Sequence, residues 1–375
     1  MPTVASFWPL LLPTVITTEV QTKVVPDSLL KLLVCPRDHL PLEQQGEILH
    51  CPHGHKYPVC QGIPVMLVET GRQTLSVATQ SLETAWRQVA GEQRDDLWCV
   101  ETLGLHDEEK ETLRQQLREA PGPVDPAARF LVGATNGMMY RHLIGHLASY
   151  PIPEIRLEAA ANRTLLDIGC NWGRWCVAAG RLGYRPIGID PSLGAVLAAR
   201  RVCSQLKISA EFVVGDARFL PFREGAFENV FSYSVLQHFP KNEATTAFAE
   251  AWRVLRAGGV GMIQMANRMG VRCLYHQIRR GFREPRNFEV RYWGIEELRR
   301  MLMNIGSDTS FSVDCFFGIG LQASDIALMS KWHAAAIRCS ERLRSWSLRL
   351  PMLTRVADSV YVRFEKRGNR LRQPT

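Results

Sequence analysis

Short apolar runs alternate with longer amphipathic stretches through the middle of the chain. Runs of this length, each ending in a polar or small residue, predict buried strands. Alternation of such strands with helices is typical of an α/β fold built around a largely parallel sheet. We therefore predict strands within residues 165–168, 186–190, 213–216, 227–234 and 260–265, and a last alternating strand over 359–364.

The first apolar run leads into a glycine-containing turn, Asp167-Ile168-Gly169-Cys170-Asn171-Trp172-Gly173, and Asp190 closes the next run. A strand, such a turn, a helix and a strand ending in Asp form half of a Rossmann nucleotide site, in which the acid bonds ribose hydroxyls. The carboxylate of Asp167 would repel a pyrophosphate, so it suits a cationic ligand that carries an ammonium group. Asn171 stands where Gly is usual, and Asn tolerates left-handed backbone better than other non-glycine residues.

This turn resembles motif I of the class I S-adenosylmethionine-dependent methyltransferases, and further motifs of that family follow in order between residues 164 and 265. The resemblance implies a Rossmann-like sheet of seven strands and S-adenosylmethionine as the cofactor. It also implies that Asp167 lies near the methionine amino group through water, and that Asp216 and Ala217 contact the adenine. The implied cofactor-binding residues are Asp167, Gly169, Asn171, Gly173, Asp190, Asp216, Ala217 and Tyr233.

The N-terminal region from Leu29 to Val68 has a separate signature. Two short turns that carry Cys and His, separated by a hairpin, form a zinc-ribbon pattern. The candidate ligands are Cys35, Asp38, Cys51 and His55, with Asp in place of a thiolate, and His39, His53 and Cys60 are reserves. The segment resembles the small zinc-ribbon protein that activates tRNA and release-factor methyltransferases. Both a zinc-binding ribbon and a ribbon that has lost its metal remain open, because zinc prefers thiolate and imidazole ligands.

Composition shifts suggest how the chain is divided. Residues 74–119 read as helical, the Pro- and Gly-rich segment 121–126 reads as a linker, and 127–149 again as helical. Tyr140 and Arg141 could cover the cofactor, or could be an ordinary packed aromatic and a solvated arginine. The predicted parts are a tail (1–27), a zinc-ribbon-like β module (28–70), a helical segment with linker (71–126), the methyltransferase core (127–270) and a helical C-terminal cap on the acceptor side (271–375).

The C-terminal third carries the basic surface. The whole chain has a net charge of +8, and residues 331–375 alone contain eleven basic and three acidic residues. A helix is expected around the start of this segment, with one apolar face formed by Met329, Trp332, Ala336, Cys339, Leu343, Trp346 and Leu350. This helix could pack on the sheet with a solvated basic face, or lie on an anionic membrane surface. RNA is the other anionic partner that the charge would allow.

The end of the fourth core strand bears on the acceptor. Ser232-Tyr233-Ser234-Val235 differs from the Asn/Asp-Pro-Pro-Tyr/Phe sequence of amino-base methyltransferases, which disfavours methylation of exocyclic base amines. Residues 235–239 resemble small-molecule methyltransferases of the ubiquinone-biosynthesis type, and His238 is the candidate catalytic base. His238 could equally be a helix cap or a pocket wall.

Three functions remain open from the sequence. The first is methylation of oxygen or carbon on a small-molecule, glycan or lipid-linked acceptor. The second is an rRNA or tRNA methyltransferase that recognises RNA through the ribbon and the basic surface. The third is a binding module without turnover. We expect a cytoplasmic protein with reduced cysteines and no transmembrane segment, because the apolar run from Val4 to Ile16 is short and interrupted by Pro9 and Pro13.

Overall fold

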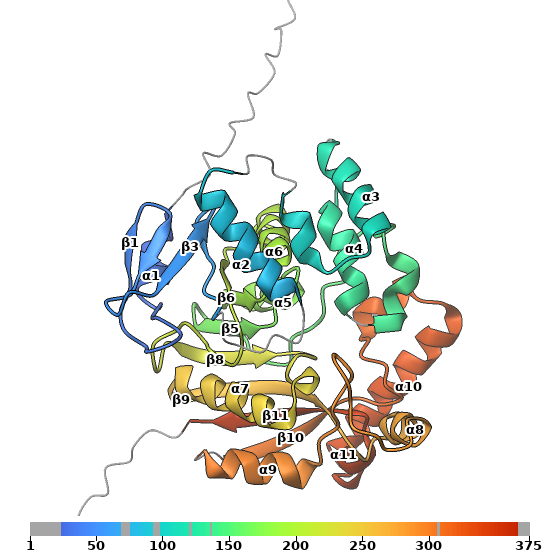
Figure 1. The fold of residues 1–375 in the computed structure, drawn as a ribbon. Coiled ribbons are helices and arrows are strands. Elements are labelled where there is room, and N and C mark those ends of the chain that lie inside the picture. Colours follow the sequence, from blue (N-terminus) through green and yellow to red (C-terminus); the bar gives the residue numbers. More distant parts are fainter. Residues whose placement is uncertain are drawn as a thin grey trace, which may run out of the picture.

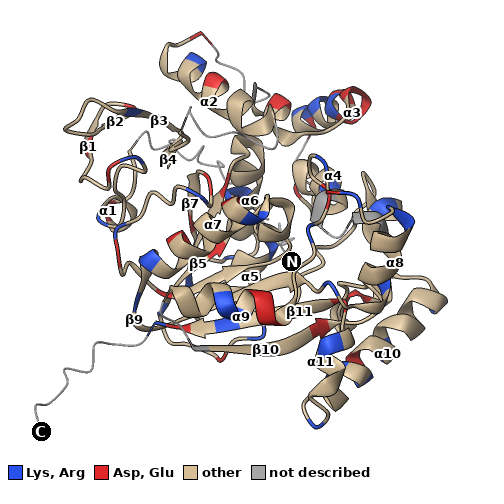
Figure 2. Cartoon of the chain, turned by 60° about the horizontal axis from the view of Figure 1, so that its bottom comes forward, with Lys and Arg blue, Asp and Glu red and all other residues tan. Residues whose placement is uncertain are grey.

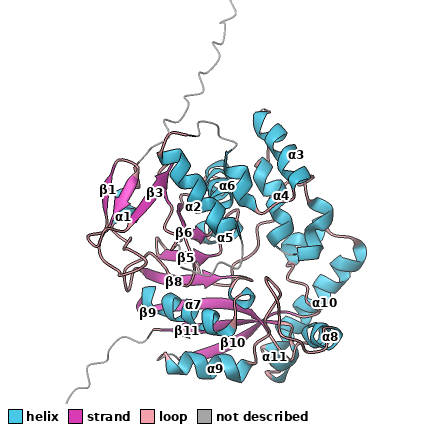
Figure 3. Ribbon diagram, viewed as in Figure 1, coloured by secondary structure: helices cyan, strands magenta, loops and turns pink. Residues whose placement is uncertain are grey.

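The structure is a computed structural model that describes residues 24–68, 76–92, 98–119, 122–135, 137–305 and 308–366. Its centre is a seven-stranded sheet in the order β10-β11-β9-β8-β5-β6-β7 (Figures 1 and 3). The strands from β9 to β7 are parallel, and β11 runs antiparallel between β9 and β10. The strands are β5 (Thr164–Ile168), β6 (Arg185–Asp190), β7 (Glu211–Val214), β8 (Phe227–Ser232), β9 (Leu255–Ala266), β10 (Asp308–Cys315) and β11 (Ser359–Glu365).

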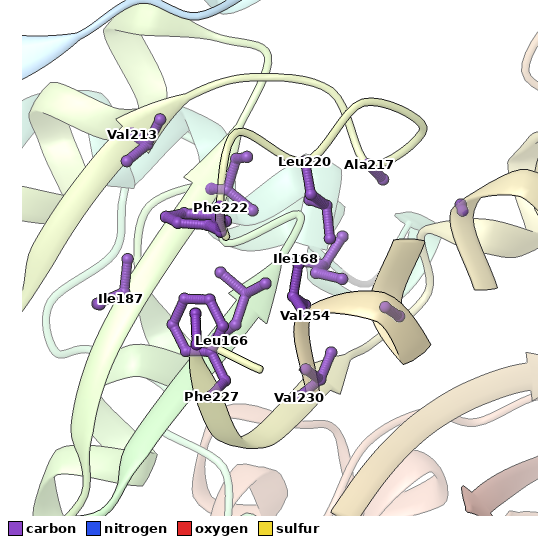
Figure 4. Close-up of a cluster of buried hydrophobic side chains, with 14 of the residues drawn as sticks. Leu166, Ile168, Ile187, Val213, Ala217, Leu220, Phe222, Phe227, Val230 and Val254 are labelled. Carbon is purple, nitrogen blue, oxygen red and sulfur yellow. The ribbon is translucent and has the colours of Figure 1, made fainter. Parts of the chain in front are cut away.

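Helices cover both faces of this sheet and create separate apolar layers. One layer packs the sheet against α7 (Lys241–Val254) and α9 (Ile295–Asn304); the other packs it against α5 (Arg174–Arg181) and α6 (Leu193–Gln205). Figure 4 shows part of the first layer, where Val254 of α7 lies beside side chains of β5 and β8. This arrangement confirms the predicted α/β, Rossmann-like fold with seven strands.

A second, antiparallel sheet forms the N-terminal module, in the strand order β1-β2-β3-β4. It docks on β7, where the Met66 amide donates to the Val214 carbonyl at 2.7 Å. Leu33 also forms an isolated bridge with Phe222 of the core. The elements of the module are α1 (Asp27–Leu30), β1 (Glu43–Gln45), β2 (Ile48–His50), β3 (Lys56–Cys60) and β4 (Ile63–Pro64).

Helices connect the two sheets, as the composition predicts. In Figure 1, α2 lies beside α6, and α3 and α4 lie to the right of it, at the end of the molecule away from α9. Most of the predicted tail and part of the predicted linker lie outside the described residues. These helices are α2 (Ser76–Val89), η1 (Trp98–Leu103), α3 (Asp107–Arg118), α4 (Pro126–Thr135) and η2 (Gly137–Leu143).

Two details of the C-terminal half differ from the expectations. Strand β9 begins at Leu255, earlier than the predicted start at residue 260, because Leu255 already pairs with Phe227 and a register shift between β8 and β9 accommodates the glycines. The remaining elements are η3 (Leu236–His238), α8 (Val271–Arg279), η4 (Ala323–Leu328), α10 (Lys331–Ser347) and α11 (Met352–Val356).

Only part of the apolar face predicted for α10 packs, namely Met329, Ala336 and Leu343, which are half-buried. Ala334, Ile337 and Ser340 are buried, whereas Trp332 is 87% exposed and Trp346 is 57% exposed. The Ser340 hydroxyl accepts from the Phe316 amide at 3.0 Å, so small residues and one hydrogen bond hold the helix against β10. Hydrophobicity alone pointed to the large side chains, which cannot approach this closely.

Candidate functional site

A cavity of about 320 Å³ opens at the carboxyl ends of β5, β6, β7 and β8. Ligands of open α/β sheets bind at this edge, where the connections that follow two neighbouring strands lead to opposite faces of the sheet. The lining includes most of the predicted cofactor residues: Gly169, Asn171, Asp190, Asp216, Ala217 and Tyr233. His238, the candidate base, also lines it.

The turn after β5 brings bare backbone to the cavity. Gly169, Asn171 and Gly173 all have positive φ, at 78°, 47° and 83°. A Cβ at Gly169 would lie 2.2 Å from a methyl group of Val235, so no larger residue fits there without displacing the chain. The left-handed Asn171 confirms that Asn can replace Gly in this turn.

Asp190 ties the first turn to the second strand. Its Oδ2 accepts from the Asn171 amide and its Oδ1 from the Ser192 amide, both at 3.0 Å. Burial raises the pKa of this carboxyl to about 6, although these two hydrogen bonds lower it in part. The side chain is therefore held in one orientation at the cavity wall.

Asp167 and Gly173 lie behind the cavity wall rather than on it. Asp167 is fully buried, and its Oδ2 accepts from the Cys176 thiol at 3.3 Å. Its Oδ1 has no hydrogen-bond partner in the described part of the chain. Burial raises the pKa of Asp167 to about 7. An acid held this way is poised to ionise when a cation comes near.

Arg174 is a cavity residue that the sequence analysis missed. It is 2% exposed and lines the cavity, and its Nε and Nη1 have no hydrogen-bond partner among the described residues. Its guanidinium lies 5.2 Å from the ring centroid of Trp175. An Arg directly after the last glycine of the turn was the available signal. Because a buried charge without a partner is costly, this side chain is suited to an anionic group of a ligand.

Asp216 and Tyr233 already have partners inside the protein. Both carboxylate oxygens of Asp216 accept from the Arg218 guanidinium, at 3.0 and 2.6 Å. The Tyr233 hydroxyl donates to Asp314 at 3.1 Å, and its ring packs 4.8 Å from that of Trp175. Burial raises the pKa of Tyr233 well above its ordinary value. These two residues shape the wall and carry neutral or compensated groups.

His238 lies at the mouth of the cavity. Its Nδ1 is 2.8 Å from the Phe288 carbonyl, which can only accept, so Nδ1 carries the proton and Nε2 is left as an acceptor. The ring stacks on Phe288, with centroids 4.0 Å apart. Burial lowers the pKa of His238 below its ordinary value, so the neutral form dominates at neutral pH.

The cover of the cavity comes from other residues than predicted. Val77 of α2, Leu103 of η1 and Leu131 of α4 line it. Tyr140 is fully buried elsewhere, with its hydroxyl 2.6 Å from Asp325, so of its two alternatives the structure takes packing. Arg141 is exposed on the surface.

The predicted metal ligands of the N-terminal module do come together. One ligand atom from each of Cys35, Asp38, Cys51 and His55 lies within 4.8 Å of all the others. The Cys51 thiol lies 3.3 Å from Asp38 Oδ2, and His55 Nδ1 lies 3.4 Å from the Cys35 sulfur. Separations of this size suit a tetrahedral ion with bonds of about 2.0–2.3 Å.

Charge in this cluster is shared by hydrogen bonds. Burial opposes ionisation of Asp38, but bonds from Cys35, the Leu40 amide, Cys51 and His53 outweigh it and lower its pKa. Burial raises the pKa of Cys51 to about 11. Of the reserve ligands, His53 contacts Asp38 at 3.0 Å, whereas Cys60 lies in an apolar core and His39 is exposed.

Comparison with known families agrees with the cavity. Residues 165–259 match the family described as "Methyltransferase domain". Residues 165–259 therefore form a class I S-adenosylmethionine-dependent methyltransferase domain. The matched range contains the turn after β5, Asp190 and His238.

Curated methyltransferases resemble part of this chain. An uncharacterized methyltransferase of Mycobacterium avium is 33% identical over 106 residues, which are 28% of this chain and 40% of that protein. A ubiquinone biosynthesis O-methyltransferase of Nitrobacter winogradskyi is 32% identical over 82 residues, 22% of this chain and 31% of that protein. The chain thus covers about two fifths or less of the length of these methyltransferases.

The N-terminal module has a relative of its own. A UPF0434 protein of Vesicomyosocius okutanii is 47% identical over 51 residues, 13% of this chain and 86% of that protein. The N-terminal module of this methyltransferase therefore belongs to the UPF0434 family.

Proposed function

We propose that this methyltransferase transfers a methyl group from S-adenosylmethionine to oxygen or carbon of a small-molecule, glycan or lipid-linked acceptor. The observation that supports it most is one cavity lined by Asp190, His238 and Arg174, two of whose nitrogens have no hydrogen-bond partner among the described residues. When bound, the cofactor supplies an activated methyl group, and the protein supplies position and, for a hydroxyl, a base.

The charged groups around the cavity suit the cofactor. Asp190 at the end of β6 would accept hydrogen bonds from the ribose hydroxyls. The methionine part carries an ammonium and a carboxylate, and the buried Asp167 and Arg174 offer the opposite charges at neighbouring positions. Gly169 lines the cavity with backbone alone, which would allow close approach of the ligand.

His238 is the proposed base for an acceptor hydroxyl. Its Nε2 is free to take a proton because Nδ1 donates to the Phe288 carbonyl. A His238→Gln variant should lose about 10²- to 10⁴-fold in kcat, the range of general-base catalysis, with unchanged binding of S-adenosylhomocysteine. Normal turnover in this variant would leave His238 as a pocket wall and favour C-methylation or an acidic acceptor.

Relatives support a small acceptor, because the ubiquinone biosynthesis O-methyltransferase matches the core. The RNA alternative draws on the basic C-terminal third and on the N-terminal module. Methylation of RNA should fall steeply as salt rises, because phosphate contacts release counterions. Methylation of a small uncharged acceptor should depend little on salt.

The direct test is transfer of labelled methyl. Purified protein and S-adenosylmethionine with a labelled methyl group are added to cell extract, and RNA, protein, lipid and small-molecule fractions are separated. Label in lipid or small molecules that disappears with Asp190→Ala supports the proposal. Label confined to RNA would replace it with the alternative.

Binding alone tests the role of Arg174. S-adenosylhomocysteine and 5′-methylthioadenosine share the adenosine and sulfur, but only the first carries the amino-acid part. Arg174→Met should weaken S-adenosylhomocysteine by about 10- to 100-fold and leave 5′-methylthioadenosine unchanged. Asp190→Ala is the control, since it should weaken both ligands equally. Equal weakening of both by Arg174→Met would argue against contact with the carboxylate.

We also infer that the N-terminal module binds zinc through Cys35, Asp38, Cys51 and His55. The convergence of these four side chains supports it. Purified protein should contain about one zinc per chain, and a strong chelator should lower its melting temperature. A Cys51→Ser variant should lose the metal, whereas Cys60→Ser should keep it. A metal-free protein that zinc does not stabilise would show a ribbon without metal.

A further inference from the structure

Exposed apolar side chains gather in one part of the molecule. In the described residues, every large hydrophobic side chain that is exposed lies between Met269 and Val356, except Val24. Single exposed apolar residues are ordinary, but a group of them marks an interaction surface.

Helix α8 presents the first part of this group. Val271, Tyr275, Ile278 and Phe282 follow one another at steps of four, three and four, so they share one side of the helix and of the turn after it. They are exposed at 62%, 57%, 58% and 66%. The opposite side of α8 packs through Cys273. We call the four residues the α8 face.

The end of α10 and the short α11 present the second part. Trp346, Leu348, Leu350, Met352 and Val356 are all exposed, Leu348 at 76% and Met352 at 73%. We call these five residues the α10–α11 edge. Leu348 and Leu350 lie in the turn between the two helices, and Met352 is the first residue of α11.

The two parts are neighbours. The Arg272 and Cys273 amides in the first turn of α8 donate to Asp358 at 2.6 and 2.9 Å, and Asp358 lies two residues beyond α11. The Asn267 side chain, just before α8, donates to the Arg355 carbonyl within α11. Figures 1 and 2 both show α8 close to α10 and α11.

Positive charge surrounds the apolar residues. Residues 268–292 contain seven arginines and two acids, and residues 331–356 contain six basic residues and one acid. Figure 2 shows basic residues on these helices. A helix with an apolar side and an arginine-rich border is typical of proteins that lie in the interface of an anionic membrane.

A basic cavity of about 440 Å³ lies at the C-terminal end of α8. Phe282 of the α8 face lines it together with five basic residues and one acid, Glu284, and some of the basic residues are paired with Glu289 or Glu297; the basic residues are Lys241, Arg268, Arg280, Arg283 and Arg291. The Nε of Arg280 is buried and has no hydrogen-bond partner in the described chain. The cavity therefore offers cationic groups to a phosphate directly beside an apolar side chain, as a lipid headgroup requires.

We propose that the α8 face and the α10–α11 edge dock this protein on an anionic membrane. RNA would use the arginines but has no use for Val271, Ile278, Leu348 and Met352, which offer no hydrogen bonds. The loop after α8 leads from Phe282 of this surface to the cofactor cavity, because the half-exposed Phe288 on that loop lines the cavity. An acceptor anchored in the membrane could therefore enter the cavity without leaving the lipid.

The described helices place this surface on the membrane and not across it. None of them is both long and apolar enough to span a bilayer. Binding would then depend on a few inserted side chains together with charge, and either contribution alone should give weak binding.

Vesicle sedimentation with the full chain tests the surface. The protein should pellet with vesicles of phosphatidylcholine mixed with phosphatidylglycerol, but not with phosphatidylcholine alone, and salt should release it. Ile278→Asp should weaken binding by about tenfold or more, because it removes an apolar side chain that would insert into the lipid and adds a negative charge that anionic lipid repels. Met303→Asp is the matched control: Met303 is 54% exposed on α9, outside both parts of the surface, and its variant should bind normally.

A second pair isolates the charge. Arg279→Glu on α8 should weaken binding to anionic vesicles, and Arg118→Glu at the end of α3 should not. Each variant is also titrated with S-adenosylhomocysteine, so that a loss of vesicle binding with normal cofactor binding separates this proposal from the proposed reaction.

Three results would overturn the proposal. One is wild-type protein that stays in solution at every lipid composition. Another is equal loss of binding in Ile278→Asp and Met303→Asp. The third is a wild-type dimer in sedimentation velocity that Ile278→Asp converts to monomer while vesicle binding is unchanged, which would assign the surface to a second copy of the chain.

Discussion

The cofactor cavity and the cysteine cluster of the N-terminal module gather polar groups in opposite ways. In the cavity, the sheet fixes the positions, and backbone at Gly169 and Asn171 forms much of the wall. Asp167 and Arg174 stay buried there without full hydrogen bonding. In the module, side chains from two small turns converge and hydrogen-bond one another.

The difference shows what each site needs from its ligand. The cavity has its shape already, and a ligand would relieve buried charges that the fold holds in place. In the cluster, thiols and a carboxylate hydrogen-bond one another, and a metal ion would displace the thiol protons. Its binding energy would then stabilise a module whose own apolar core is small.

The largest effect should come from the shape of the cavity. Gly169→Ala adds a Cβ 2.2 Å from Val235 at a φ of 78°, and should reduce S-adenosylhomocysteine affinity by about 100-fold or more. Gly258→Ala is the matched control, with a φ of 75° and no atom within 4 Å of the added Cβ. Calorimetric titration measures both, and similar affinities in the two variants would contradict a preformed wall.

The next effect concerns the ligands of the cluster. Asp38→Cys would complete a set of three thiolates and one imidazole, which zinc prefers to a set with a carboxylate. Zinc affinity should rise by about 10- to 100-fold in competition with a chromophoric chelator. Cofactor affinity should stay unchanged, since the cluster lies outside the cavity. A decrease in zinc affinity would show that Asp38 is no ligand.

The smallest effect is a difference in pH dependence. The pKa values of Asp167 and Asp190 are raised in the folded protein, to about 7 and about 6, so the free protein should lose stability as pH rises from about 4 to 7. The pKa of Asp38 is lowered, so its contribution is present above about pH 4 and is lost as pH falls.

Ligand binding should follow the cavity acids. The ammonium group of S-adenosylhomocysteine favours the ionised form of Asp167, so its affinity should increase about tenfold between pH 5 and 7. Asp167→Asn should flatten this increase, and titration at several pH values measures it. An unchanged slope in that variant would assign the proton to another group.

The core was predictable from sequence because its signals are local. Each of the predicted strands 165–168, 186–190 and 227–234 has a short apolar run and a polar end, and these features do not depend on the rest of the chain. The four cysteine-cluster residues were predictable for the same reason, since each pair sits on one turn.

The parts that differed depend on contacts between distant residues. The packed side of α10 is decided by Ser340 meeting Phe316, and the place of Tyr140 by Asp325. Arg174 looked like the first residue of an ordinary helix, and only the fold shows that it is buried beside Asp167 without a full set of hydrogen bonds. Hydrophobicity along the sequence contains none of this information.

The hydrogen bond between Met66 and Val214 joins the N-terminal module to the β7 edge of the main sheet, and the two parts occur in a ratio of one to one. Because the module and the core belong to one polypeptide, every copy of the enzyme is made with its sheet edge covered, however dilute the cell keeps it. Two separate proteins would depend on their relative supply and would leave some edges open to self-association. Joining them in one gene removes that dependence at the cost of inheriting both parts together.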